Sequence, residues 1–196
     1  AAITVALELG VDVKSGKRAL SRFAGIGRRA NPLGDLVFGE GDQARRVALV
    51  DDYGQHPTEV AATLEAIRGG WAGRRLVVVF QPHRYSRTRD LFEDFADVLS
   101  TPDVLLLSEV YPAGEERIQG ADGRALAGAI RQRRGPGGGV DPIFVEDIDD
   151  IPAQLGCIVE AGDVVLTLGA GSVGALAQRM VRECGVAVRD GARGTG

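Results

Sequence analysis

Basic and ionisable side chains gather at the end of a strand that reads as buried. The strand is LVVVF, residues 76–80, and the cluster that follows it contains His83, Arg84, Arg87 and Arg89. A helix is expected from Ser86, and cations in a first helical turn oppose the helix dipole by about a few tenths of a kcal/mol per charge. An anion held between the side chains removes this cost. Arg84 and Arg87 can fork onto one carboxylate or phosphate, with His83 as a third donor.

A solvated basic face is the alternative interpretation of the same cluster. Asp90, Glu93 and Asp94 follow the arginines along the expected helix. Carboxylates at this spacing can pair with arginines on an exposed helix surface. Spacing alone leaves both interpretations open.

A second polar cluster, DDYGQHPTE, follows the strand expected at 44–52. Asp51 and Asp52 can accept hydrogen bonds from ribose hydroxyls or hold a magnesium ion through water. A capping role for one of them is the alternative. Both histidines of the chain, His56 and His83, fall in loops that follow an expected strand. A functional role is therefore more strongly expected here than for a lone histidine.

Two further stretches are compatible with anion binding. GIGRR, which contains Arg28 and Arg29, can contact a phosphate or form a surface turn. LGAGSVG, residues 168–174, matches G-x-G-x-x-G between a strand and a helix. A dinucleotide fold continues with a strand that carries an acidic residue about 20 positions on, and too little chain follows here. The glycines therefore indicate either an anion at the helix start or tight packing of helix on sheet.

Regular alternation of strands and helices positions these clusters. Strands are expected at 44–52, 74–80, 103–110, 142–146 and 163–168, and helices at 57–70, 86–100, 123–134, 147–161 and 171–184. Two helices, near 1–9 and 13–25, come first, and a basic turn spans 25–34. Continuously apolar strands that alternate with amphipathic helices predict an α/β fold: a Rossmann-like, doubly wound, mostly parallel sheet with helices on both faces. Ligands then belong at the carboxyl ends of the strands.

Composition and net charge limit the classes of partner that are expected for this chain. The 196 residues carry a formal net charge of -4 with a pI near 5.3, which argues against binding nucleic acid by bulk phosphate neutralisation. No apolar run approaches the ~20 residues of a bilayer span, so no membrane association and a cytoplasmic location are expected. Cys157 and Cys184 lack the spacing of a metal site or disulfide framework and are expected to be buried, reduced thiols.

Several of these segments together carry a family resemblance. They are DDYGQHPTEV, VVVFQPHRYSRTRDLFEDF, LLLSEVYPAGEE, ADGRAL, DPIFVEDI and GDVVLTLGAGSVGALA. Between about Phe23 and Met180 the chain resembles the C-terminal domain of the Mur ligases, in their alanine-adding members. AAITVALELG resembles the last helix of that family's central ATP-binding domain. The resemblance divides the chain into a remnant of the central domain and hinge (1–22) and the C-terminal domain (23–185). The rest, 186–196, ends in a stretch without apolar periodicity and is expected to be a disordered tail.

The resemblance implies ATP-dependent amide formation in peptidoglycan synthesis, with L-alanine added to UDP-N-acetylmuramate. ATP and Mg²⁺ are expected to bind mainly through the central domain, because this sequence has no G-x-x-x-x-G-K-[ST]. The chain alone is therefore expected to be inactive. Alternatives are a free-standing nucleotide-binding module that uses GAGSVG, and a related peptide-recycling or folylpolyglutamate-type ligase.

The resemblance also assigns residues. His83, Arg84 and Arg87 would hold the carboxylate of the incoming amino acid, and Tyr53 would line the same pocket. Asp52 would bind the ribose of ATP, and Arg28 or Arg29 would approach the nucleotide; no metal ligand and no catalytic residue is assigned.

One position departs from the family pattern. The family usually has two histidines after DDYG, where this chain has Gln55 and His56. The first of the two is expected to face the amino-acid pocket. Glutamine donates and accepts hydrogen bonds but does not become cationic near neutral pH, so a charged role at Gln55 is in doubt.

Overall fold

The computed structural model describes residues 2–22, 28–133 and 139–186. Its strands are β1 (Asn31–Phe38), β2 (Arg45–Asp52), β3 (Leu76–Phe80), β4 (Val104–Ser108), β5 (Ile143–Val145), β6 (Val164–Leu168) and β7 (Gly185–Val186). Its α-helices are α1 (Ala2–Glu8), α2 (Val13–Arg22), α3 (Pro57–Gly70), α4 (Tyr85–Asp90), α5 (Phe92–Val98), α6 (Gly123–Gln132), α7 (Ile151–Ile158) and α8 (Val173–Cys184). Short 3₁₀ turns cover η1 (Gly41–Gln43) and η2 (Ile148–Asp150).

One seven-stranded sheet organises the α/β part, in the order β5-β4-β3-β6-β2-β1-β7. The five strands from β5 to β2 pair in parallel, and β1 pairs antiparallel with both β2 and β7. The mostly parallel α/β sheet predicted from the sequence is thus confirmed. The chain moves outward from β3 to β5 and then returns to place β6 between β3 and β2.

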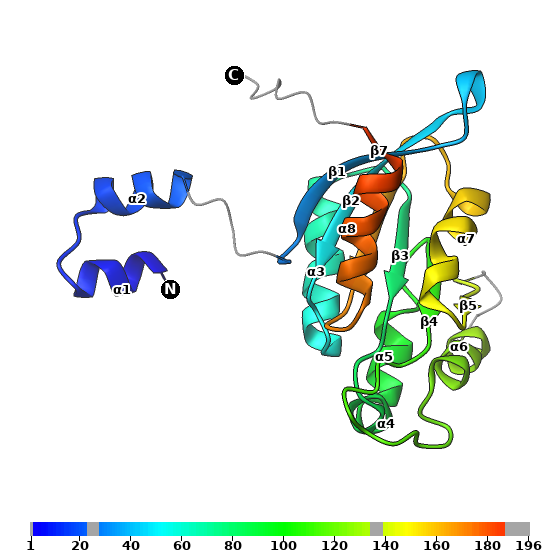
Figure 1. Ribbon diagram of the computed structural model, residues 1–196. Coiled ribbons are helices and arrows are strands. Elements are labelled where there is room, and N and C mark those ends of the chain that lie inside the picture. Colours follow the sequence, from blue (N-terminus) through cyan, green and yellow to red (C-terminus); the bar gives the residue numbers. More distant parts are fainter. Residues whose placement is uncertain (1, 23–27, 134–138, 187–196) are drawn as a thin grey trace.

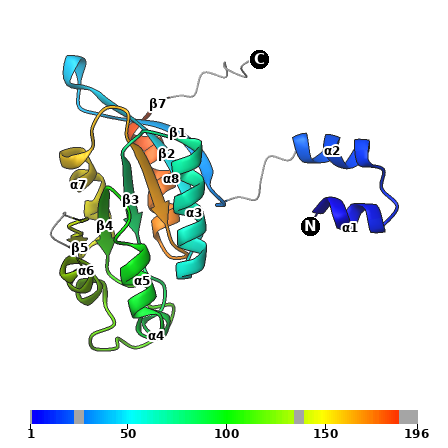
Figure 2. The ribbon, with the colours of Figure 1, turned by 180° about the vertical axis from the view of Figure 1, so that it is seen from behind.

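Helices cover both faces of the sheet, as predicted. One core lies under α3, α5 and α6, and contains side chains such as Val60, Leu64, Phe95, Leu99, Leu126 and Ile130 packed on Val78, Phe80 and Leu166. The other lies under α7 and α8, where Ile151, Leu155, Leu176 and Met180 pack on Val77, Val79 and Val165. Figure 1 shows α8 across the near face, and Figure 2 shows α3 and α5 across the opposite one. All five side chains of β3 are buried because both faces are covered.

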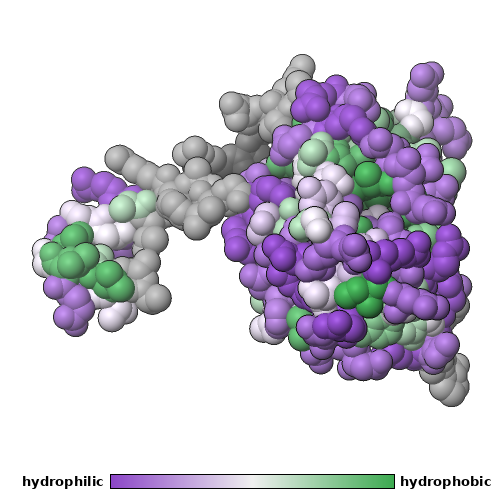
Figure 3. Space-filling view, turned by 60° about the horizontal axis from the view of Figure 1, so that its bottom comes forward, coloured by the Kyte–Doolittle hydropathy of each residue, from purple (hydrophilic) through white to green (hydrophobic). Residues whose placement is uncertain are grey.

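The carboxyl ends of the parallel strands form one polar rim. Backbone pairing continues past the strand ends, since Gln81 N–H donates to Leu168 O at 3.0 Å and Gly169 N–H donates to Asp52 O at 3.2 Å. The loops that follow β2, β3 and β6 are therefore held together. Figure 3 turns the lower end of Figure 1 toward the reader and shows a surface that is mainly hydrophilic, with small hydrophobic patches.

Three predictions of local structure were wrong. The basic turn expected at 25–34 ends in a strand, β1, from Asn31, and residues 25–27 of that turn lie outside the described part. Pro32 and Gly34 mask the strand in the sequence, and the register shifts between those two residues. The helix expected at 86–100 is divided at Leu91, whose backbone (φ −118°, ψ 25°) leaves the helical region.

The third error concerns the cysteines. Cys157 is exposed and Cys184 half-buried, where two buried thiols were expected. The reason is helical geometry: α7 turns Ile151 and Leu155 toward the sheet, and position 157 falls on the outward side of so short a helix.

Helices α1 and α2 occupy the range assigned to a separate first segment (Figure 1). The domain boundaries expected from the sequence stay predictions. β7 ends at Val186, and the remainder of the expected tail, 187–196, lies outside the described residues. No helix in the described part of the chain is both long and apolar enough to cross a bilayer.

Candidate anion-binding site

The backbone at Arg84 is strained and held in place from two sides. Its φ is +74°, a region that favours glycine. Its N–H donates to Tyr111 O at 2.8 Å, and its carbonyl accepts from both the N–H and the hydroxyl of buried Thr88. Strain of this kind costs about 1–3 kcal/mol and persists only where the surroundings fix it, which is frequent at functional sites. The turn that presents the basic cluster is therefore built by β4 as well as β3.

Glu115 supplies a carboxylate at the start of α4. Its oxygens accept from the Ser86 N–H at 2.9 Å and the Ser86 hydroxyl at 2.6 Å, and Arg84 lies 3.6 Å away. The two hydrogen bonds from Ser86, followed by the charge of Arg84, lower the pKa of Glu115. Part of the anion predicted between the arginines is thus provided by the chain itself. Arg84 and Arg87 do not fork onto one group here.

Arg87 takes a different direction from Arg84. Its Nη1 donates to Gln55 Oε1 at 2.9 Å and to His83 O at 3.1 Å, and lies 3.3 Å from His83 Nδ1. Among the residues that the structure describes, no carboxylate lies within ion-pair distance of Arg87. The structure therefore brings together three predicted site residues from two loops, with a guanidinium charge that has only neutral partners.

His83 is fixed by the loop after β4. Its ring stacks on Tyr111 with centroids 5.4 Å apart and planes 17° from parallel, and the two residues form a β-bridge. Burial lowers the pKa of His83, and the charges of Arg87 and Arg84 lower it further, against a smaller raising effect of Glu115. The imidazole is thus biased toward its neutral form.

His56, the other histidine, has a structural role. Its Nδ1 accepts from Thr58 N–H at 3.3 Å, and Glu59 Oε2 accepts in return from the His56 and Gln55 N–H groups. This reciprocal capping box, with Pro57 at the first helical turn, starts α3. The cap also fixes the backbone of Gln55, and the Gln55 N–H lowers the pKa of Glu59.

The acidic pair after β2 is turned inward. Asp51 is fully buried and accepts from Arg28 Nε and the Thr167 hydroxyl, each at 2.8 Å. Asp52 is 3% exposed and accepts from the N–H groups of Ala30 and Gly54 at 2.6 and 2.7 Å. Both carboxylates therefore tie the entering loop to the sheet, and neither caps a helix.

The glycine-rich turn after β6 is filled by the chain's own side chains. A Cβ at Gly171 would overlap Tyr111 and Gln81, and a Cβ at Gly174 would overlap the Arg28 guanidinium. Gln81 Oε1 accepts from Val173 N–H at 3.0 Å, and Arg28 Nη2 donates to Gly169 O at 2.6 Å. Tight packing, one of the two roles that the sequence left open, accounts for these glycines.

Tyr53 and Arg29 remain on the surface. Tyr53 is 37% exposed, and the guanidinium carbons of Arg28 and Arg29 lie 5.1 and 5.8 Å from the centroid of its ring. Arg29 also lies 3.9 Å from Glu59. Of the three residues assigned to a nucleotide, Arg29 has the loosest internal partner, because its ion pair with Glu59 spans 3.9 Å while Arg28 and Asp52 make short hydrogen bonds. Within the described ranges no group of three or more His, Cys, Asp or Glu residues is placed to hold a metal ion.

The comparison with protein families follows the same region of the chain. Residues 38–171, which hold most of the sheet and the basic cluster, match the family model described as Mur ligase, glutamate ligase domain. The chain belongs to this family. Among curated relatives of this Mur ligase domain, UDP-N-acetylmuramate–L-alanine ligase of Halorhodospira halophila is 59% identical over 176 residues, which cover 90% of this chain and 35% of that protein. The domain thus spans about a third of that relative.

Solved structures agree with the Mur ligase fold. UDP-N-acetylmuramate-alanine ligase MurC of Thermotoga maritima superposes with a TM-score of 0.69 at 24% identity, over 92% of this chain and 35% of that one. Folylpolyglutamate synthase of Mycobacterium tuberculosis, solved with ADP and AMPPCP, gives 0.56 at 16% identity, over 96% of this chain and 38% of that one. At these identities the likeness concerns the fold alone.

Sequence reasoning missed three residues of this Mur ligase domain that organise the cluster: Gln81, Tyr111 and Glu115. Each follows the end of a parallel strand, so its position on the rim was visible in the sequence. The side-chain partners were not, because they come from loops far apart in the chain.

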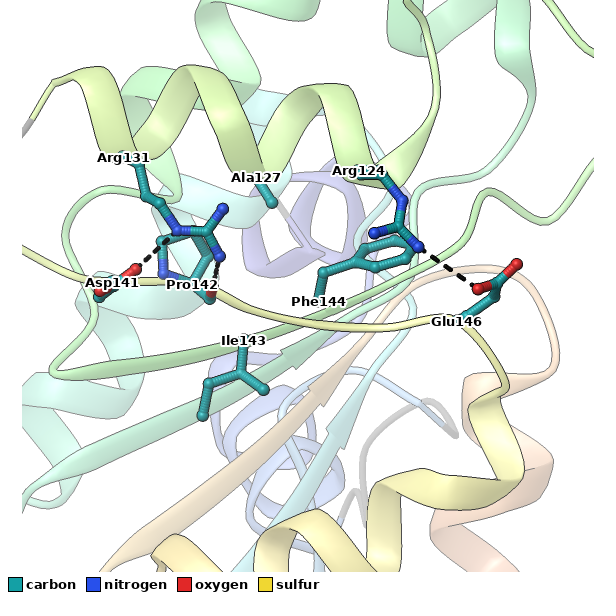
Figure 4. Close-up of a pocket in the computed structure, with 8 residues that line it drawn as sticks. All are labelled: Arg124, Ala127, Arg131, Asp141, Pro142, Ile143, Phe144 and Glu146. Atoms are coloured by element: carbon teal, nitrogen blue, oxygen red, sulfur yellow. Dashed lines mark hydrogen bonds and ion pairs between the residues drawn. The ribbon is translucent and has the colours of Figure 1, made fainter.

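A separate groove of the Mur ligase domain lies beside edge strand β5, away from the cluster. It measures about 640 Å³ and lies between α6 and β5. Figure 4 shows Arg124 over the Phe144 ring and bonded to Glu146, and Arg131 bonded to Asp141 and to the Pro142 carbonyl. Both arginines of the groove thus already have acidic partners, and it contains none of the predicted site residues.

Proposed function

We propose that this Mur ligase domain binds the amino acid in an ATP-dependent ligase that adds L-alanine to UDP-N-acetylmuramate for peptidoglycan synthesis. Membership of the family and the 59% identity to a ligase of that name support the reaction. The geometry of Arg87 supports the location of the amino acid.

The observation that carries the proposal is the state of Arg87. Its Nη1 is used by Gln55 and His83, and no described partner takes Nε or Nη2. These two nitrogens are not buried, because the described residues contain no buried side-chain nitrogen or oxygen without a partner. Two open donors of one guanidinium match a carboxylate in the forked geometry. Arg84, which is exposed and lies 3.6 Å from Glu115, is on the same loop.

The proposed reaction proceeds through an acyl phosphate. The muramyl carboxylate takes the terminal phosphoryl group of ATP and releases ADP; the amine of L-alanine then attacks the acyl carbon, and phosphate leaves as the amide forms. In this scheme Arg87, Arg84 and His83 hold the carboxylate of L-alanine, with Tyr53 and Gln55 beside it. Holding that end aims the amine and lowers the entropic cost of the attack.

ATP and Mg²⁺ are assigned mainly to the part of the ligase outside this chain. Asp52 does not fit the expected ribose contact as it stands, because it is buried and both oxygens have partners. Arg28 fits no better, because it bonds to Asp51 and Gly169. Arg29, half-exposed and beside Tyr53, is the residue of the three that we assign to approach the nucleotide when the domains close.

Steady-state kinetics of the ligase that carries this domain test the proposal. Arg87→Ala is expected to raise the KM for L-alanine by about 10- to 100-fold, corresponding to about 1.5–3 kcal/mol for a charge-assisted hydrogen bond. The KM values for UDP-N-acetylmuramate and ATP are expected to change little. Arg89→Ala is the matched control, because Arg89 lies on the same helix, is exposed and pairs with Asp90. Equal increases in all three KM values would contradict the proposal.

The alternatives have less support. A nucleotide-binding module would need an open turn after β6, and that turn holds Gln81, Tyr111 and Arg28. Peptide-recycling and folylpolyglutamate-type ligases share the fold, but the identity of 59% is to an alanine-adding ligase.

A further inference from the structure

We propose that Arg87 fixes His83 as the neutral imidazole with its proton on Nε2, so that His83 acts in the site as an uncharged hydrogen-bond donor. The assignment of a ligand to this donor rests on the proposed function above. The state of the ring itself does not.

The direction of one hydrogen bond decides the tautomer. Arg87 Nη1 lies 3.3 Å from His83 Nδ1. A guanidinium carries only donors, and Nη1 shares its two hydrogens among Nδ1, His83 O and Gln55 Oε1. An N–H on Nδ1 would point at this cationic nitrogen, so the contact favours an Nδ1 that accepts and carries no proton. In a neutral imidazole the proton then belongs to Nε2. A protonated His83 would point an N–H at the guanidinium and lose this bond.

Contacts with Tyr111 and Arg87 restrict rotation of the His83 ring. Tyr111 stacks on its face at 5.4 Å. Arg87 is anchored by the His83 carbonyl at 3.1 Å and by Gln55 Oε1 at 2.9 Å, and so approaches Nδ1 from a fixed direction. Arg87 is therefore a positioning residue for His83 in addition to its own charge.

The other ring nitrogen is open. No residue in the described ranges bonds to His83 Nε2, and those ranges contain no buried side-chain nitrogen without a partner, so Nε2 faces solvent. The Nε2 proton and the Nε and Nη2 hydrogens of Arg87 are donors without an acceptor among the described residues. An anion with two or more oxygens, such as a carboxylate, suits these donors.

The charged groups around the His83 ring also favour its neutral form. Arg87 and Arg84 lie on its own helix and loop, and Glu115 lies on the loop after β4. Burial and the two arginines lower the pKa of His83, and Glu115 opposes them more weakly. The uncharged donor therefore persists to a lower pH than in an ordinary histidine, whose pKa is about 6.5.

Nitrogen NMR on the full chain labelled with ¹⁵N-histidine tests this inference directly. Only two histidines contribute signals, His56 and His83, and His56→Asn, which keeps an acceptor for the α3 cap, assigns them. We expect His83 to show a protonated Nε2 and an unprotonated Nδ1 at pH 7, and to titrate below pH 6.5. Arg87→Ala is expected to raise that midpoint toward 6.5 and to allow exchange between the two tautomers. Arg89→Ala, which removes the same charge without contacting His83, is expected to keep the single tautomer.

Two outcomes would overturn the inference: a proton on Nδ1 in the unaltered chain, or a His83 tautomer and midpoint that Arg87→Ala leaves unchanged. The spectrum of the unaltered chain decides the first even where a variant folds poorly. Because no substrate is present, failure here is distinct from failure of the proposed function, which the KM for L-alanine reports.

Discussion

Glu115 accepts hydrogen bonds from both the N–H and the hydroxyl of Ser86, and so places a carboxylate at the first turn of α4. Because of this contact, the basic cluster already contains an acidic group of the chain itself. Arg84 is compensated internally by Glu115 at 3.6 Å, and the charge left for an external anion is mainly that of Arg87. The first prediction tests whether Glu115 compensates the charge of Arg84.

Glu115→Gln is expected to lower the thermal midpoint of the chain, because an amide is a weaker acceptor than a carboxylate and leaves Arg84 uncompensated. Glu116→Gln removes the same charge from the neighbouring exposed position and is expected to have little effect. Since the pKa of Glu115 is lowered in the folded state, its contribution is present above pH 4.5 and is lost as pH falls further. Equal midpoints for the two variants at pH 7 would count against a stabilising role of the Glu115 contacts with Ser86 and Arg84.

His83 gives a separate dependence of stability on pH. Its pKa in the folded chain lies below the value of about 6.5 in the unfolded chain, so the unfolded state binds more protons between these two values. The free energy of unfolding is therefore expected to fall as pH decreases from 6.5, and to level off below the folded pKa. Urea unfolding from pH 7.5 to 5 measures this slope. His83→Gln is expected to reduce it, and an unchanged slope would contradict the assignment.

Gln55 gives Arg87 an uncharged hydrogen-bond partner. Gln55→His places a titratable ring against Arg87 Nη1, where Gln55 Oε1 now accepts at 2.9 Å. A cationic ring there would repel the guanidinium, so in the intact ligase the KM for L-alanine is expected to rise as pH falls from 7 to 5.5, more steeply than with Gln55. Gln119→His, at an exposed loop position, is the control. Parallel pH profiles in all three proteins would show that Gln55 does not reach the amino acid.

Two helical glycines are expected to respond with opposite signs to alanine. Gly128 in α6 has open space around it, so Gly128→Ala should stabilise the chain by about 0.5–1 kcal/mol through helix propensity. At Gly174 in α8 the new Cβ would displace the Arg28 guanidinium from buried Asp51. Gly174→Ala should therefore destabilise by about 1–3 kcal/mol, as measured by denaturant unfolding.

A double-mutant cycle isolates the cause of that loss. In an Arg28→Ala background, Gly174→Ala has no guanidinium to displace and should cost much less than in the unaltered chain. Additive effects of the two substitutions would show that Gly174 acts independently of Arg28.

The sequence predicts the layers of the fold well, because hydrophobic periodicity reports burial directly. The buried strand at 76–80 and the start of the helix at Pro57 are local features, and both appear as expected. Strand order is not local: nothing in DVVLTL states that β6 enters between β3 and β2. β1 was missed because Pro32 and Gly34 interrupt its pattern.

In the candidate site, too, local features could be predicted from the sequence, and contacts between distant segments could not. Residue types and strand ends placed His83, Arg84 and Arg87 on the ligand rim, and the unfavourable helix dipole indicated an anion. The sequence could not show that Glu115 would supply part of that anion, since the two segments meet through the pairing of β3 with β4 and the bridge between His83 and Tyr111. It also could not show that Asp52 faces inward, because that depends on the course of the loop at Ala30.

The most direct test of the central claim compares L-alanine with L-alaninamide, which lacks the carboxylate, as substrates of the intact ligase. The unaltered enzyme is expected to favour L-alanine in kcat/KM, and Arg87→Ala is expected to reduce that preference by about 10- to 100-fold, in line with one charge-assisted contact. Arg89→Ala should keep the full preference. If Arg87→Ala discriminates between the two substrates as strongly as the unaltered enzyme, then Arg87 does not bind the carboxylate of the amino acid.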